Sequence, residues 1–229
     1  MYIKGKYRAN DTMSQLICDD HLLLLVISRF GISLGFANKT IKEVCDENNV
    51  ELNTFLAVAN LILRAKDNNY KPSIDDIDIE CLVSFLRNSH SYFINVRLPK
   101  IRKKLISIVG DDKISSLIIR YFDDYVLQIG KHFDYEDSVL FPYIDKLKDN
   151  IDADGFTVDK YSERHDHIDE PLTEFKDVII QYWSTENSEE LNEIIYDLLN
   201  SANDLLLHNM CEDRLLVPII SKMEKKYGK

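Results

Sequence analysis

The chain has 229 residues, 45% of them hydrophobic, and a formal net charge of -11 at pH 7. A surface this acidic argues against general binding to nucleic acid or to anionic membranes, since both require clustered positive charge. Seven glycines and five prolines are few for the length, which favours long helices over a turn-rich all-β fold.

The cysteines and the N-terminus indicate a cytoplasmic protein. Cys18, Cys45, Cys81 and Cys211 show no paired spacing, which is typical of reduced thiols in a chain of this size. The N-terminus has no apolar signal segment, and no apolar run in the sequence is long enough to span a bilayer.

Residues 1–70 are expected to form a small helical domain. Thr40 is a candidate N-cap for the helix IKEVCDEN, with Glu43 in the third position of a capping box, and residues 52–63 form another short helix. The polar stretch 65–75 contains a proline and is expected to be a linker.

Four long segments with helical periodicity follow the linker. They cover about residues 75–108, 112–148, 157–184 and 188–225. The breaks between them are short and polar, so consecutive helices should be antiparallel neighbours. The sequence therefore predicts an all-α protein in which residues 71–229 form an up-down-up-down four-helix bundle, preceded by the small helical domain.

Polar residues interrupt the apolar stripe of two of these helices with the same spacing. His132 and Glu136 replace apolar residues in the second helix, and His208 and Glu212 do so in the fourth. A proline follows each glutamate after six residues. Because residues at i and i+4 share one helical face, each helix presents an imidazole nitrogen and a carboxylate oxygen together.

The other two helices place one histidine each on the apolar stripe, His90 in the first and His165 in the third. His167 lies about 200° around the helix from His165, among glutamates, and is expected to face solvent. A buried carboxylate is costly unless it is paired or bound to a cation. Four imidazoles and two carboxylates in one core therefore predict a metal site.

The donor types narrow the choice of metal. Nitrogen and oxygen ligands without thiolate suit iron, manganese or zinc. Two glutamates can bridge two metal ions while two histidines cap each of them, and six ligands shared by two ions leave coordination positions open. The site is thus expected to hold two ions and to be reactive.

The segments HFDYEDSVLFP, ERHDHIDEPL and HNMCEDRLLVP resemble the hemerythrin-like (HHE cation-binding) domain. The order, with a small domain first, resembles the di-iron proteins that repair iron centres after oxidative or nitrosative stress. This resemblance implies a centre of two iron ions, bridged by an oxygen atom or by carboxylates. The implied metal ligands are His90, His132, Glu136, His165, His208 and Glu212.

The chain departs from the repair family in its N-terminal part. That family has an adjacent pair of cysteines at a position that corresponds here to residues 31–38, GISLGFAN, which contain none. Cys18 and Cys45 are the candidates to replace the pair, although nothing in the sequence pairs them.

Two functions are compatible with these residues. The first is a stress-response protein that binds or reacts with O2 or NO, or supplies iron to an iron–sulfur protein; the sequence leaves open whether it is an enzyme. The alternative is a sensor of O2, NO or iron that signals through the N-terminal domain to a protein or DNA partner. DNA is the less favoured partner. In the helix-turn-helix-like stretch 40–66, the second helix offers only two basic residues, Arg64 and Lys66 at its end, which is too few for contacts to phosphate.

Overall fold

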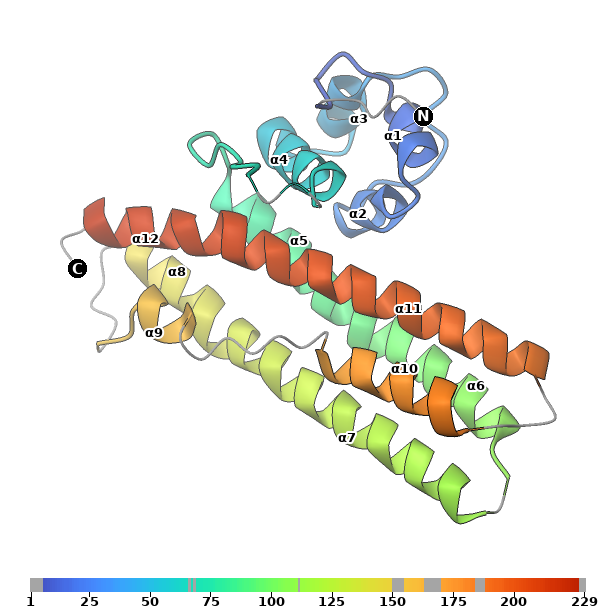
Figure 1. The fold of residues 1–229 in the computed structure, drawn as a ribbon. Helices are drawn as coiled ribbons and strands as arrows, with labels where there is room; N and C mark the ends of the chain where they lie inside the picture. Colours follow the sequence, from blue (N-terminus) through green and yellow to red (C-terminus); the bar gives the residue numbers. More distant parts are fainter. Residues whose placement is uncertain are drawn as a thin grey trace. The chain divides into compact units, whose positions relative to one another are not determined.

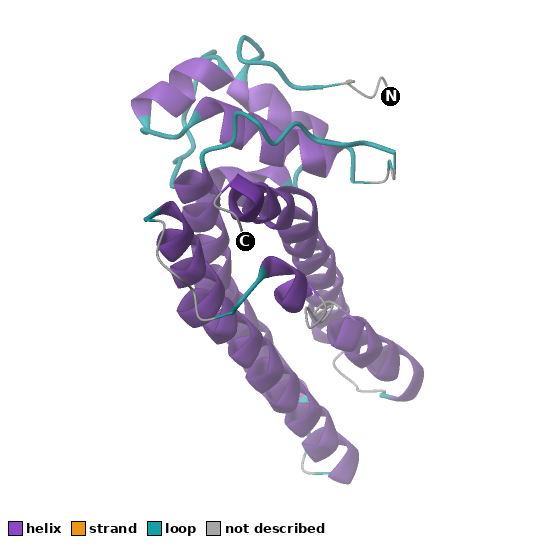
Figure 2. Ribbon diagram, turned by 90° about the vertical axis from the view of Figure 1, so that its left-hand side faces the viewer, coloured by secondary structure: helices purple, strands orange, loops and turns teal. Residues whose placement is uncertain are grey.

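The computed structural model describes residues 6–65, 67, 69–110, 112–149, 155–162, 170–183 and 188–226. Over these ranges the elements are helices, and the one β-type contact is an isolated bridge between Thr12 and Thr40 (Figures 1 and 2). The prediction of an all-α fold is confirmed. No helix in these ranges is long and apolar enough to cross a membrane.

The chain folds into two compact units. The first comprises Met1–Ser89, Lys146–Glu163 and Leu207–Lys229, and the second comprises His90–Asp145 and Arg164–Leu206. The boundary at residue 70 between a small domain and a bundle stays a prediction.

The first unit begins with four short helices. They are α1 (Met13–Asp19), α2 (Leu23–Arg29), α3 (Ile41–Glu47) and α4 (Leu52–Leu63). The predicted capping box starts α3: the Thr40 hydroxyl accepts from the Glu43 N–H at 3.2 Å, and the Glu43 carboxylate accepts from the Thr40 N–H at 2.7 Å. The predicted helix over residues 52–63 is also confirmed.

Helix α4 is the centre of this group of helices. It contacts both α2 and α3 and buries seven of its residues. Those residues are Thr54, Phe55, Val58, Ala59, Asn60, Leu61 and Ile62. Asn60 also fixes the incoming chain, because its side-chain oxygen accepts from the Tyr7 N–H at 2.6 Å. A helix buried in this way packs the N-terminal part together.

Three long helical runs follow, and each contains one π-helical turn of five residues. The first run is α5 (Ile79–Tyr92), η1 (Phe93–Arg97) and α6 (Leu98–Ile108). The second is α7 (Lys113–Tyr135), η2 (Glu136–Leu140) and α8 (Phe141–Lys148). The third is α11 (Ser188–Cys211), η3 (Glu212–Leu216) and α12 (Val217–Lys226). These runs match the helices predicted from periodicity to within a few residues.

Proline explains where the π-helical turns lie. Pro99, Pro142 and Pro218 each follow their turn by two residues. In all three turns the residue before the proline donates its N–H to the carbonyl five residues back, as Phe141 does to Glu136. Proline has no N–H to donate, so a regular α-helix would leave a carbonyl without a donor here. The wider turn accommodates that missing bond.

The third predicted helix, over residues 157–184, is described in two pieces, α9 (Val158–Ser162) and α10 (Glu170–Tyr182). In the first unit α9 packs on α12, and the Glu224 carboxylate accepts from the Val158 N–H at 2.8 Å. In the second unit α10 packs on α7, which also contacts α6.

The core of the second unit is apolar and is supplied by all four of its helical segments. Its fully buried members include Leu105 from α6, Phe122 and Ile129 from α7, Phe175 from α10 and Leu198 from α11. These residues belong to, or continue, the apolar stripes expected from the sequence. The core would therefore hold the helices together without help from a metal.

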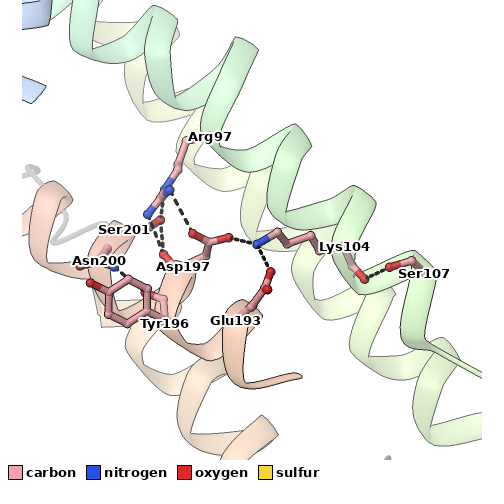
Figure 3. Close-up of polar contacts among 8 residues, drawn as sticks. All are labelled: Arg97, Lys104, Ser107, Glu193, Tyr196, Asp197, Asn200 and Ser201. Carbon is pink, nitrogen blue, oxygen red and sulfur yellow. Dashed lines mark hydrogen bonds and ion pairs between the residues drawn. The ribbon is translucent and has the colours of Figure 1, made fainter. Parts of the chain in front are cut away.

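A network of ions links the first and last helical runs within the second unit (Figure 3). The Arg97 guanidinium donates to the Ser201 hydroxyl at 2.8 Å and to an Asp197 carboxylate oxygen at 3.2 Å. Lys104 donates to Asp197 at 2.8 Å and to Glu193 at 3.0 Å. The Arg97 and Asp197 side chains are 14% and 12% exposed, so this pair is largely shielded from water.

Candidate metal centre

Glu136 is the first residue of the π-helical turn η2, and its side chain is fully buried. One carboxylate oxygen lies 3.2 Å from Nε2 of His90, and the other lies 3.0 Å from Nε2 of His132. His132 is one turn earlier on α7 and is 13% exposed. Each oxygen of this buried carboxylate thus faces a different imidazole.

Aromatic rings hold the plane of the His90 imidazole. The ring stacks on Phe133 at 4.1 Å between centroids, with 13° between the planes, and lies nearly parallel to Phe141 at 5.7 Å. Its second nitrogen, Nδ1, is 3.3 Å from the Asp137 carboxylate. His90 is therefore buried, stacked and faced by one carboxylate at each nitrogen.

The second copy of the motif has the same local structure. Glu212 is the first residue of η3 and is fully buried, and its carboxylate lies 3.2 Å from Nε2 of His208. The His208 side chain is also fully buried. In both copies the glutamate therefore starts a π-helical turn and the histidine lies one helical turn before it. π-Helical turns of this kind often occur at functional sites.

Four of the predicted ligands form one group. His90, Glu136, His208 and Glu212 are all buried, and one ligand atom from each lies within 4.8 Å of the others. His132 joins this group through its contact with Glu136. His165, the remaining predicted ligand, lies outside the described residues, and so does His167, which was expected to face solvent.

The chemistry of these donors fits a metal ion. Two fully buried carboxylates are costly in an apolar core, and the facing imidazoles carry a positive charge only when they are protonated. A cation with nitrogen and oxygen ligands would compensate both carboxylates at once, and iron accepts this set of donors.

The model of the hemerythrin HHE cation binding domain matches residues 81–220 of the chain. The chain belongs to this family. Hemerythrin HHE domains bind metal ions, typically iron, in a helical bundle, which agrees with the helices and the His/Glu group described above. Comparisons with curated proteins and with solved structures give no match.

Family membership confirms the resemblance drawn from the sequence at the level of the hemerythrin domain. The closer resemblance to the iron-centre repair proteins stays a prediction, and so does the complete set of six ligands. Sequence reasoning missed Asp137. The available signal was a repeated Glu-Asp pair, since Asp137 follows Glu136 just as Asp213 follows Glu212.

Proposed function

We propose that this hemerythrin-like protein binds two iron ions and acts in oxidative or nitrosative stress. The proposed ligands are His90, His132, Glu136, His165, His208 and Glu212. Iron bound there would supply open coordination positions for O2 or NO. The observation that carries the proposal is the group of four buried ligands, in which two carboxylates converge with two imidazoles.

The surrounding residues support binding of a small ligand in a dry site. Phe133 and Phe141 lie nearly parallel to the His90 ring, and the two glutamates have no exposed surface. In such surroundings the electrostatic interactions between charged groups are stronger than in water. The protein would therefore position the imidazoles and exclude solvent, while Glu136 and Glu212 would help to hold the iron.

Supply of iron to a damaged iron–sulfur protein is the less favoured form of this function. Residues 31–38, where the repair family has two cysteines, contain none. Cys45 does not replace them: it is fully buried, and its burial, with the nearby charge of Asp46, raises the pKa of the thiol to about 12. Metal binding requires the thiolate, so Cys45 is a poor acceptor of iron.

A sensor that signals through the N-terminal part is the alternative. A DNA-binding version would use α4 as the recognition helix, but α4 buries seven of its twelve residues. Arg64, at the end of α4, is paired with Asp67 and lies over the ring of Tyr70 at 5.2 Å. A protein partner therefore suits the sensor better than DNA does.

The test is to load the protein with Fe(II) without oxygen and record the absorption spectrum before and after adding O2 or NO. We expect new bands with either gas, and loss of the response in a variant that carries both Glu136→Ala and Glu212→Ala. The loaded protein should restore a damaged iron–sulfur protein poorly. Efficient restoration that is unaffected by Cys18→Ser and Cys45→Ser would show that thiols are not needed and would favour iron supply.

A further inference from the structure

We propose that Asp137 is a positioning residue for the metal centre, which selects the tautomer and the orientation of the His90 imidazole. The inference rests on the proposed function, because it assigns Nε2 of His90 as the nitrogen that binds metal. Asp137 would act through His90 and would not itself bind the metal.

The two nitrogens of His90 face two neighbouring carboxylates. Nε2 is 3.2 Å from Glu136, and Nδ1 is 3.3 Å from Asp137. A neutral imidazole carries one proton, and the hydrogen bond made by one nitrogen decides which nitrogen is free to bind metal. In the tautomer that we propose, the Nδ1–H is directed at the Asp137 carboxylate, which leaves the lone pair of Nε2 on the side of Glu136.

Exposure separates the roles of the two carboxylates. The Glu136 side chain is fully buried and belongs to the group of four ligands, whereas the Asp137 side chain is 36% exposed and does not. Asp137 can therefore face Nδ1 from the solvent side of the ring while Glu136 faces Nε2 from the buried side. Metal-binding histidines commonly donate their second N–H to a carboxylate in this way.

The fold restrains the orientation of the imidazole. Phe133 and Phe141 lie nearly parallel to the ring, so a flip about the Cβ–Cγ bond, which would put carbons in the places of Nδ1 and Nε2, has to turn the ring out of this stack. Glu136 and Asp137 favour the observed orientation, because each faces a nitrogen in it and would face a carbon after the flip. Glu136 and Asp137 reach the same ring because both lie at the start of the π-helical turn η2.

The first measurement uses metal-free protein labelled with ¹⁵N at histidine. We expect a slowly exchanging proton on Nδ1 of His90, identified by its absence from a His90→Phe variant. The proton should exchange much faster in Asp137→Ala, and Asp137→Asn should restore part of the protection, because its amide oxygen can still accept. An Nδ1 proton that is as protected in Asp137→Ala as in the wild-type protein would overturn the proposal.

The second measurement is the affinity for Zn(II), chosen because it takes the same donors without redox chemistry. Asp137→Ala should weaken binding by about 10- to 100-fold, and Asp137→Asn by less. Asp134→Asn is the matched control: it removes the same charge from an exposed residue of α7 and should bind like the wild-type protein. Equal affinities for Asp137→Ala and Asp134→Asn would overturn the proposal.

The two measurements separate this inference from the proposed function. A wild-type protein that fails to bind metal, yet shows the protected Nδ1 proton, would contradict the metal centre and still support the Asp137–His90 contact. A wild-type protein that binds metal, with affinity and proton protection indifferent to Asp137, would support the centre and contradict the positioning role.

Discussion

Removal of metal should destabilise the protein without unfolding it. The perturbation is chelation of the loaded protein under conditions in which the metal-free form stays in solution. The apolar core of the second unit contains none of the proposed ligands, so its helices should persist without metal. What the metal-free protein loses is the free energy of binding, since the unfolded chain has no preformed site.

The expected loss of folding free energy follows from the binding of two ions per chain. One site filled at a hundred times its dissociation constant stabilises the folded state by about 2.7 kcal/mol, so two independent sites contribute about 5 kcal/mol. For a protein of this length, 1 kcal/mol shifts the melting temperature by about 2–4 °C. Chelation should therefore lower the melting temperature by about 10–20 °C while the helical circular dichroism changes little.

The assay is thermal unfolding followed by circular dichroism, with and without chelator. The control is the double variant Glu136→Ala, Glu212→Ala, whose melting temperature should not respond to the chelator. If the wild-type protein melts at the same temperature in both conditions, the six residues are not organised around metal as argued. A chelated protein that loses its helical signal would show instead that the apolar core cannot support the fold.

Three further outcomes are expected. Glu136→Ala should lower the metal content sharply, because it removes a carboxylate that faces two imidazoles; unchanged content in elemental analysis would exclude its role. Arg97→Ala should cost about 2–3 kcal/mol in denaturant unfolding, because it leaves the shielded Asp197 with fewer donors, whereas Arg102→Ala, which breaks a half-exposed pair, should shift the midpoint little. Alkylation of the native protein should modify Cys18 and spare Cys45, whose buried thiol has a pKa of about 12; equal labelling in mass spectra would contradict that burial.

Local signals in the sequence were sufficient for the helices. The Thr40–Glu43 capping box forms as predicted because both of its hydrogen bonds are made within one turn. The i, i+4 spacing likewise places Glu136 next to His132 and Glu212 next to His208, since the helix itself fixes those distances.

The π-helical turns could not be predicted from a pattern with a period of 3.6 residues. Inside the turn the buried position comes one residue later than a step of three from Glu136: Leu140 is fully buried, whereas Val139 is half-buried. The signal was present in the prolines, because Pro142 and Pro218 lie inside long helical stretches that would otherwise end or bend there.

The contact between His90 and Asp137 depends on tertiary structure. The two residues are 47 positions apart, and no spacing rule links a residue of the first long helix to one of the second. The sequence could show that Asp137 follows a ligand, as Asp213 does, but the ring that it faces emerges only when the helices pack.

The most direct test of the metal centre is the iron content and Mössbauer spectrum of protein purified without oxygen and loaded with ⁵⁷Fe(II). We predict about two iron ions per chain in wild-type protein, with a spectrum of two coupled ions after oxidation, and less than one ion per chain in the double variant Glu136→Ala, Glu212→Ala. One uncoupled ion per chain, or equal iron in both proteins, would contradict a carboxylate-bridged pair of iron ions at these residues.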